Sequence, residues 1–347
     1  MKLWEMWKYS AVVSMVLICL LLGLALLAAE THLLQEELPE EALPEMKLPE
    51  RPVSEQMRAM QDNEFTVRVL DAGIVMGMPL QEYLTGVVRA EMPASFEQEA
   101  LCAQAVAART YTLYKMRDGG KHPDADICTN PACCQAYRSA AQTADGRGTA
   151  ASQNEEKIRK AVTSTDGQIM VYNGEPILAV FHSAAPGQTR RAGDVWSTEV
   201  PYLQSVSSPE DGGSIPDYYS CVEVMQQTFC EVFKQAHPEA DFTGRPEGWI
   251  TGVTTAGGCV NMVVVGGVAV RGVELRQLYG LRSAAFETEA RDGKIIFYVT
   301  GYGHGVGMSQ YGANEMAKKG ADWQTILLHY YTGISIEMWR EPLGEAV

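Results

Sequence analysis

Residues 82–114, EYLTGVVRAEMPASFEQEALCAQAVAARTYTLY, contain two helical patterns joined by a short break. In the first pattern apolar side chains recur at helical spacing, and Pro93 ends it because proline disfavours the helical conformation of the residue before it. Ser95 then offers an N-cap, with Gln98 three residues later, which is the capping-box pattern. The alanine-rich run that follows has high helix propensity. The stretch therefore predicts two helices joined by an elbow.

Glu91 stands at the end of the first predicted helix, beside the elbow. A carboxylate that rigid elements hold at the edge of a cleft is well placed to act as a general acid or base. Arg109 shares a face of the second predicted helix with apolar side chains, so its guanidinium needs a partner, which Glu91, Glu82 or a bound anion would supply. From periodicity alone, a solvated Glu91 and an arginine that snorkels to the surface is the alternative.

The two helical patterns also carry an ordered motif, Glu-Tyr-Leu-x-Gly-Val-Val-x-x-Glu-Met-Pro followed by Glu-Ala-Leu-x-Ala-Gln-Ala-Val-Ala-Ala-Arg-Thr-Tyr. This motif resembles the stage II sporulation protein D family of peptidoglycan lytic transglycosylases from endospore-forming bacteria. The resemblance covers about residues 63–337. It implies that Glu91, the glutamate before Met-Pro, is the catalytic residue, and the arginine of the family motif falls on Arg109. Because a direct ion pair with Arg109 would oppose protonation of Glu91, we expect Arg109 to bind and position the glycan or to position the elbow.

The composition limits the classes of ligand. Hydrophobic residues make up 46% of the 347 residues and charged residues 20%, which is typical of a globular protein. The chain has 28 Lys and Arg against 43 Asp and Glu, a formal net charge of −15. Nucleic acid phosphates would be repelled by this excess, so we expect no nucleic acid partner, whereas an uncharged glycan remains a candidate ligand.

The N-terminal part predicts a membrane anchor. Residues 11–29, AVVSMVLICLLLGLALLAA, form an uncharged apolar run, and Lys2 and Lys8 precede it. About 20 such residues span a bilayer core, so we expect a single-pass transmembrane helix, with residues 1–10 cytoplasmic and the catalytic domain on the outer side of the cell membrane. A signal peptide cleaved near residue 29 is the alternative. Residues 30–62 are acidic and proline-rich, which predicts an extended stalk.

Residues 63–347 are expected to form one catalytic domain. Val171-Tyr172-Asn173-Gly174 places Asn-Gly between apolar runs, which predicts a β-hairpin. Strand and helix patterns follow one another without regular alternation, which favours the α+β class, with a substrate cleft between a helical half and a strand-rich half. The other strand patterns are at 65–70, 249–258, 260–270 and 294–300, and the other helical patterns are at 155–163, 273–279, 313–319 and 322–331.

The glycine-rich run 301–310, GYGHGVGMSQ, follows a strand pattern and lacks the GxxxxGK spacing of a nucleotide loop. Alternating glycines allow the backbone to approach a ligand closely, and His304, Ser309 and Gln310 would then present polar groups to a sugar. A tight turn with an N-cap at Ser309 is an equal alternative. The run is also similar to the sporulation family, where it borders the active-site cleft, and this favours substrate contact.

Phe181-His182-Ser183 resembles a third motif of the family, and the resemblance continues to Tyr202. It implies that His182, Ser183 and Tyr202 contact the substrate. Two departures stand out: Ala184-Ala185-Pro186 follow the serine where the family has small polar residues and glycines, and Gln204 stands where relatives have a basic residue.

A cluster of potential metal ligands, His122, Cys128, Cys133 and Cys134, lies in a segment with little apolar content. These soft and borderline ligands suit tetrahedral zinc, although the spacing is not that of a standard finger, and a disulfide or free thiols are the alternatives. Some members of the family bind a metal through a His and Cys cluster here, usually with a histidine where Cys133 stands. The resemblance therefore favours a structural Zn²⁺ held by all four residues.

Together the motifs imply an enzyme that cuts peptidoglycan glycan strands between N-acetylmuramic acid and N-acetylglucosamine and leaves 1,6-anhydro ends. The resemblance places this activity in sporulation engulfment, with membrane-bound partners of the engulfment machinery. The acid must start protonated, so we expect burial to raise the pKa of Glu91. One alternative is a zinc-dependent wall hydrolase, which a complete set of four protein ligands argues against. The other is a non-enzymatic glycan-binding scaffold for other wall enzymes.

Overall fold

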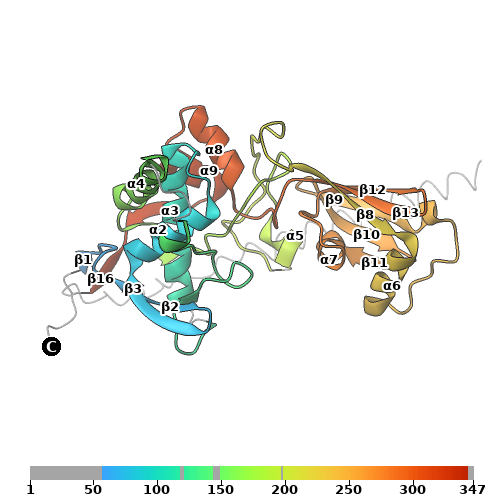
Figure 1. Ribbon diagram of the computed structural model, residues 1–347, viewed down its shortest axis with the longest axis horizontal. Coiled ribbons are helices and arrows are strands. Elements are labelled where there is room, and N and C mark those ends of the chain that lie inside the picture. Colours follow the sequence, from blue (N-terminus) through green and yellow to red (C-terminus); the bar gives the residue numbers. More distant parts are fainter. Residues whose placement is uncertain (1–56, 118–120, 144–148, 197, 343–347) are drawn as a thin grey trace, which may run out of the picture. The chain divides into compact units, whose positions relative to one another are not determined.

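The computed structural model describes residues 57–117, 121–143, 149–196 and 198–342. Residues 56–347 belong to one compact unit. In its described part, helices and small sheets follow one another without regular alternation (Figure 1), so the predicted mixed α+β class is confirmed.

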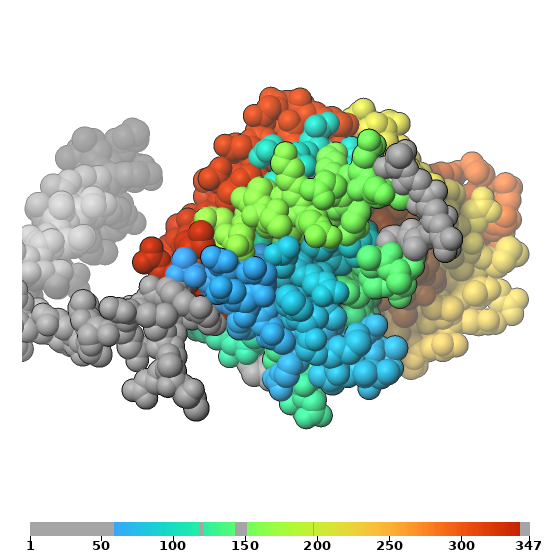
Figure 2. Space-filling model, turned by 60° about the vertical axis from the view of Figure 1, so that its left-hand side comes forward, coloured from blue at the N-terminus to red at the C-terminus, as the bar shows by residue number. Residues whose placement is uncertain are grey.

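Helix α3 (Gln98–Arg117) forms the centre of the larger core, and its side chains at positions 100–113 are all buried. Its many alanines allow neighbouring elements to approach on every side. Figure 2 shows some of these neighbours, distant in sequence, side by side on one face of the molecule. The helices that pack against α3 are α2 (Leu80–Glu91), α4 (Thr149–Ser164), α8 (Gln310–Lys318) and α9 (Trp323–Tyr330).

Helices α2 and α3 confirm the two predicted helices and the elbow between them. Helix α2 ends at Glu91 because Met92, the residue before Pro93, is extended, with φ −124° and ψ 140°. The predicted N-cap at Ser95 is wrong. The N–H of Phe96 bonds to the carbonyl of Pro93 and continues the turn, so the first carbonyl to accept from α3 is that of Glu97.

Small sheets surround the α3 core. The predicted hairpin at 171–174 is confirmed, and Asn173 (φ 53°) and Gly174 (φ 78°) both have the positive φ of a type I′ turn. Three-stranded sheets are formed by β2 (Thr66–Asp71) with β3 (Ile74–Pro79) and β4 (Ile127–Cys128), and by β5 (Gln168–Tyr172) with β6 (Glu175–Pro176) and β15 (Ser335–Met338). Strand β1 (Met57–Ala59) pairs with β16 (Arg340–Pro342).

A second apolar core lies in the strand-rich part of the chain. The strand predicted at 260–270 is two strands, because Gly266 (φ 54°) and Gly267 (φ 81°) turn the chain within it. One sheet contains β8 (Tyr219–Met225), β13 (Lys294–Thr300) and β12 (Phe286–Arg291), and the other contains β9 (Ile250–Ala256), β10 (Cys259–Val265) and β11 (Val268–Arg271). Helices α6 (Gln226–Ala236) and α7 (Gly272–Leu278) and the 3₁₀ turn η2 (Pro246–Gly248) belong to this part.

Two of the sequence motifs meet in a short parallel pair. Strand β14 (Met308–Ser309), at the end of the glycine-rich run, pairs with β7 (Phe181–His182), with Ser309 opposite His182. The short helix α5 (Ala192–Trp196) follows β7, and the 3₁₀ turn η1 (Ala141–Thr143) precedes α4. The two motifs are thus joined by a direct backbone contact.

The prediction of a single-pass membrane protein must be corrected. Within the described ranges, no helix is both long enough and apolar enough to cross a bilayer. The run at 11–29 on which the prediction rested, like the cytoplasmic segment 1–10 and most of the stalk at 30–62, lies outside the described residues.

Candidate active site

Glu91 is the last residue of α2 and is partly buried. Its Oε1 accepts the backbone N–H of Ala136 at 2.8 Å, and its Oε2 accepts a long hydrogen bond of 3.5 Å from the side-chain amide of Gln310. Burial raises the pKa of the Glu91 carboxyl above its usual range, and these two donors oppose the rise. A carboxyl with a raised pKa and neutral partners suits a group that must first donate a proton and then take one back.

The segment 135–138, which supplies the Ala136 donor, is held tightly against α2. The ring of Tyr137 stacks on Tyr83 with centroids 5.8 Å apart and 6° between the planes. A Cβ on Gly86 would lie 2.1 Å from the Tyr137 ring, so only glycine allows this approach. The N–H of Arg138 then bonds to the carbonyl of Gly86 at 3.1 Å. The donor to Glu91 is therefore fixed by packing on both sides of it.

Gln310 is the predicted glycan contact that the structure brings to Glu91. It begins α8, is 6% exposed, and its Nε2 lies between Glu91 Oε2 and Gln104 Oε1 of α3, at 3.5 and 3.4 Å. Its neighbour Ser309 caps α8 by accepting the N–H of Gly312 at 3.2 Å, which is the N-cap alternative of the sequence analysis. Ser309 is fully buried, so its hydroxyl does not face a substrate.

Arg109 is not at the site, and its assignment to substrate binding must be corrected. The guanidinium is 0% exposed and pairs with Asp62, with Nε–Oδ1 2.8 Å and Nη2–Oδ2 2.5 Å. It also donates to the carbonyls of Gln168 and Val162, at 3.1 and 3.2 Å. None of the partners considered from the sequence is used. Because these partners take up its donors, Arg109 has none left for a glycan, and it ties the start of the domain to α3.

The predicted histidine contacts are structural. His182 is 4% exposed, and its Nδ1 lies 3.2 Å from the carbonyl of Val306. His304 accepts the N–H of Val306 at Nδ1 (3.1 Å) and lies 3.0 Å from the carbonyl of Phe181 at Nε2, so the neutral Nε2–H tautomer fits both partners. Burial lowers the pKa of His182 to about 3 and that of His304 to about 4. Both imidazoles are neutral at physiological pH and hold the glycine-rich run against β7.

Ser183 and Tyr202, the remaining predicted contacts, serve the packing around β7. The backbone carbonyl of Ser183 accepts the N–H of Tyr311 at 3.0 Å, while the residue keeps some exposed surface. The hydroxyl of Tyr202 accepts the N–H of Leu178 at 2.9 Å, and its ring lies 5.4 Å from that of Tyr172. Neither residue is hydrogen bonded to Glu91 or Gln310.

His122, Cys128, Cys133 and Cys134 converge, with their ligand atoms all within 4.8 Å of one another. Cys133 Sγ and Cys134 Sγ lie 3.6 and 3.7 Å from His122 Nε2 and 3.9 Å from each other. A tetrahedral zinc with ordinary Zn–S and Zn–N bonds separates its ligand atoms by about 3.5–3.8 Å. The cysteines are free, so the disulfide alternative does not apply. These four side chains can hold a metal ion.

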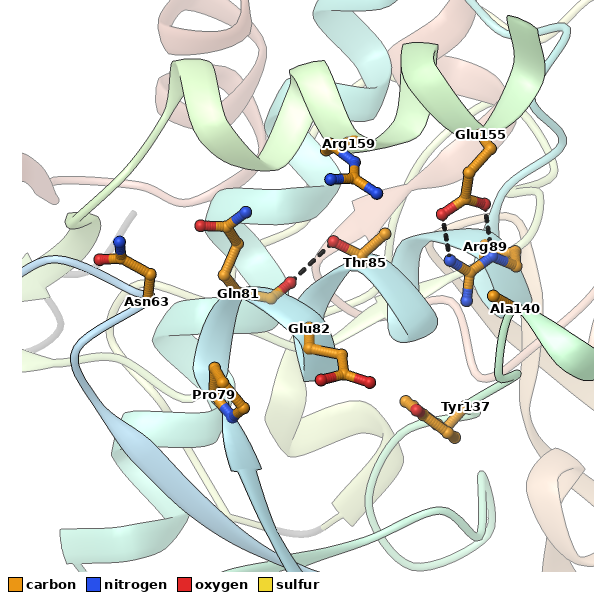
Figure 3. A pocket seen from close by; sticks show the side chains of 10 residues that line it. All are labelled: Asn63, Pro79, Gln81, Glu82, Thr85, Arg89, Tyr137, Ala140, Glu155 and Arg159. Carbon is orange, nitrogen blue, oxygen red and sulfur yellow. Dashed lines mark hydrogen bonds and ion pairs between the residues drawn. The ribbon is translucent and has the colours of Figure 1, made fainter. Parts of the chain in front are cut away.

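Figure 3 shows a pocket between α2 and α4 whose lining includes Glu82, Thr85 and Arg89. Its volume is about 370 Å³. Arg89 forms an ion pair there with Glu155 of α4, at 2.5 Å between Nη2 and Oε1. Glu82 and Glu91 are separated by about two and a half helical turns, so they lie on opposite faces of α2. The pocket does not open onto Glu91, and we do not assign the reaction to it.

The sequence analysis missed the groups that orient Glu91. Ala136 acts through its backbone and Gln104 through an ordinary helix position, so neither gives a signal in the sequence. Asp62, the partner of Arg109, was also missed, because it lies outside the motifs and was assigned to the stalk. Gly86 gave a usable signal, because a glycine inside a helix lowers its stability and therefore indicates close packing.

Comparisons with known proteins agree with the motifs. A family model described as stage II sporulation protein matches residues 71–172, which include Glu91 and the His/Cys cluster. The stage II sporulation protein D of Bacillus amyloliquefaciens is 39% identical over 265 residues, covering 76% of this chain and 75% of the relative. That of Bacillus subtilis (strain 168) is 40% identical over 265 residues, with the same coverage.

A more distant relative is the amidase enhancer of Bacillus subtilis (strain 168), 28% identical over 301 residues. The match covers 73% of this chain and 40% of the amidase enhancer. The level and extent of identity to the two sporulation proteins confirm the prediction from the motifs: the chain belongs to the stage II sporulation protein D family.

Proposed function

We propose that this protein is a peptidoglycan lytic transglycosylase and that Glu91 is its acid and base. The observation that carries the proposal is the state of Glu91: its pKa is raised by burial, and its hydrogen-bond partners are two amide donors. Within the described part of the chain, no second carboxylate shares those hydrogen bonds. Hydrolytic glycosidases use a pair of carboxylates, whereas an intramolecular attack needs only one. Family membership and the name of the amidase enhancer support a role in sporulation and the cell wall.

In the proposed reaction, protonated Glu91 donates its proton to the oxygen that links N-acetylmuramic acid to N-acetylglucosamine. The bond from this oxygen to the anomeric carbon of the muramic residue breaks through an oxocarbenium-like state. The Glu91 carboxylate then takes the proton of the C6 hydroxyl, whose oxygen bonds to the anomeric carbon and closes the 1,6-anhydro ring. Ala136 N–H and the Gln310 amide stabilise the carboxylate between the two proton transfers. No water is consumed, and Glu91 ends protonated.

The His122, Cys128, Cys133 and Cys134 cluster is proposed to hold a structural Zn²⁺. When bound by four protein ligands, zinc has no open position for water, so it would supply folding stability and not hydrolytic chemistry. The cluster directly precedes the segment 135–138 that donates to Glu91. We further propose that the protein acts in engulfment during sporulation, together with other proteins of that machinery.

The test replaces Glu91 with glutamine, which keeps the shape of the side chain and removes its ability to transfer a proton. The Glu91→Gln protein should bind peptidoglycan but release no anhydro-muropeptides, by a loss of at least about 10³-fold. Products are read by mass spectrometry in ¹⁸O-labelled water. Labelled reducing ends from the wild type would identify a hydrolase, and an uncut glycan would favour the scaffold alternative. Normal anhydro products from Glu91→Gln would refute the role of Glu91.

A further inference from the structure

Arg190 is a fully buried arginine that lacks acceptors for most of its guanidinium. It is 1% exposed, and its Nη2 donates to the backbone carbonyl of Asp194 at 3.0 Å. Its Nε and Nη1 are buried and have no hydrogen-bond partner within the described residues. Buried charges in native proteins are normally paired, because an uncompensated one is strongly unfavourable. The side chain therefore has unused capacity for an acceptor.

Arg190 cannot turn outward to find that acceptor in solvent. Its backbone N–H bonds to the carbonyl of Gly305 at 2.7 Å, which anchors the residue to the glycine-rich run. A Cβ on Gly305 would lie 3.1 Å from Arg190 Cδ, and a Cβ on Gly257 would lie 3.1 Å from Arg190 Cγ. The aliphatic stem thus passes between two glycine backbones. This clamp fixes the guanidinium where it is and excludes snorkelling.

Two further arginines, Arg271 at the end of β11 and Arg276 in the last turn of α7, lie near Arg190. Arg271 Nη2 donates to the Asp194 carbonyl that Arg190 also uses, at 2.6 Å. Arg276 is partly exposed, and burial together with the charge of Arg190 lowers its pKa. The carboxylate of Asp194 is engaged by Arg191, at 3.2 Å. In the described part of the chain, no carboxylate forms an ion pair with Arg190 or Arg276. Within the described residues, Arg190 and Arg276 therefore have no carboxylate in direct contact, although the charge of the Asp194 carboxylate acts on Arg190.

Groups of the protein next to these arginines do not neutralise them. Burial raises the pKa of the Cys259 thiol to about 11, so it is uncharged at neutral pH even though both guanidiniums favour the thiolate. His304 is neutral as well, and the nearby arginines contribute to its low pKa. Trp196, which is 40% exposed, lies 5.4 Å from the ring of His304 and offers an apolar surface beside the charged one.

We propose that Arg190, Arg271 and Arg276 form a binding site for an oxyanion, the carboxylate or phosphate group of a ligand. Guanidinium groups suit such ligands because their N–H donors match the oxygens of both. The oxyanion would enter on the side of the partly exposed Arg276 and accept hydrogen bonds from the buried Nε and Nη1 of Arg190. If the proposed function holds, glycan strands without stem peptides carry the fitting group, because N-acetylmuramic acid differs from N-acetylglucosamine by a lactyl group whose carboxylate is free when no peptide is attached. The exposed indole of Trp196 then suits the sugar ring.

The test uses that chemical difference between the two sugars. The full-length chain is titrated by calorimetry with N-acetylmuramic acid, N-acetylglucosamine or inorganic phosphate at constant ionic strength, and the midpoint of thermal unfolding is recorded. N-acetylmuramic acid should bind and raise the midpoint, and N-acetylglucosamine should do neither. Arg190→Met should weaken binding by about tenfold to a hundredfold, the value of one lost charge-assisted interaction. Arg276→Gln, at a partly exposed position, should weaken it in the same direction.

The matched control is Arg191→Met, which removes the same charge from the neighbouring, half-exposed arginine. It should bind as the wild type does. Binding of phosphate but not of the acid sugar would support the oxyanion site and assign it to a phosphate source. Equal responses to both sugars, no response to any oxyanion, or unchanged binding in Arg190→Met would overturn the proposal. Because the experiment measures binding, it tests the oxyanion site separately from the cutting reaction of Glu91.

Discussion

Two buried arginines, Arg109 in the elbow region around Glu91 and Arg190 in the glycine-rich region, are paired in opposite ways. In the elbow region, Arg109 is 0% exposed and makes hydrogen bonds to both carboxylate oxygens of Asp62 and to two backbone carbonyls. In the glycine-rich region, Arg190 is 1% exposed and has one carbonyl acceptor. Among the described residues, Nε2 of His182 is likewise buried without a partner. Equal burial thus accompanies complete pairing of one guanidinium and incomplete pairing of the other.

This difference separates a guanidinium whose hydrogen bonds are complete from one that has unused binding capacity. In the elbow region, the ion pair of Arg109 fixes α3 and the packing of Tyr137 fixes the segment 135–138, so the donors to Glu91 need no rearrangement before reaction. The glycine-rich region keeps its donors in place by backbone packing and leaves them without acceptors, which is the arrangement expected before a ligand binds. Replacing the two buried arginines by the same residue compares the two regions directly.

The largest effect is expected for Arg109→Met. The variant leaves the carboxylate of Asp62, which is 1% exposed, buried without its counter-ion. Breaking a buried ion pair by removing one partner lowers the free energy of unfolding by about 3–5 kcal/mol. Denaturant unfolding followed by circular dichroism measures it. Adding Asp62→Leu to Arg109→Met should recover most of the loss, because the uncompensated charge is then gone. A loss below about 1 kcal/mol in the single variant would contradict the comparison.

An intermediate effect is expected on mild acidification, and it should arise in the glycine-rich region. His182 and His304 have pKa values lowered by burial from 6.5 to about 3 and about 4. In the unfolded chain they take up protons below pH 6.5, whereas in the folded chain they stay neutral. Stability should therefore fall as the pH drops below 6.5, by about 1 kcal/mol for each histidine between pH 6.5 and 5.5.

The measurement is denaturant unfolding at both pH values in the wild type and in His182→Asn. The variant should lose about half of the difference between pH 6.5 and 5.5. His329→Gln, which removes a partly exposed imidazole that lies 2.7 Å from the carbonyl of Ser207, is measured alongside to show what the loss of another histidine does to stability. A wild-type stability that does not change over this range would show that the two imidazoles are not held neutral.

Local patterns in the sequence predicted local structure well. Periodicity and Pro93 located both helices of the elbow, and Asn173-Gly174 located a hairpin, because each signal acts within a few residues. The motif placed Glu91 at a helix end, where the structure has it. The partner of Arg109 was not predictable, because Asp62 is 47 residues away and follows a segment with no packing period. The prediction of a membrane protein rested on composition at 11–29, and the described helices give it no support.

The glycine-rich region shows a different limit of sequence reasoning. His304 and Ser309 were predicted as sugar contacts because polar residues beside glycines suggest a ligand, and His182 was predicted from the resemblance of its motif to the family. In the structure their polar atoms hold β7, β14 and α8 together. The burial of Arg190 could not be predicted, because a second arginine follows it and a pair of basic residues is typical of a solvent-exposed surface. Burial of one and exposure of the other depend on Gly257 and Gly305, which are 67 and 115 positions later.

The smallest effect is expected for Arg190→Met. Unlike Arg109, Arg190 leaves no carboxylate behind when it is replaced, because the Asp194 group that it contacts is a backbone carbonyl that Arg271 also bonds. The substitution removes an uncompensated buried charge and keeps most of the side-chain volume between the two glycines. Exchanging buried charge for apolar volume is often neutral or stabilising, so the free energy of unfolding should change by less than about 1 kcal/mol or increase. Unfolding is measured without phosphate or carboxylate buffers, under the conditions used for Arg109→Met. In the presence of a bound oxyanion the wild type alone should gain stability, so the same substitution should then look destabilising. A loss for Arg190→Met as large as that for Arg109→Met in an anion-free buffer would show that Arg190 already has a partner in the protein and would remove the contrast between the two regions.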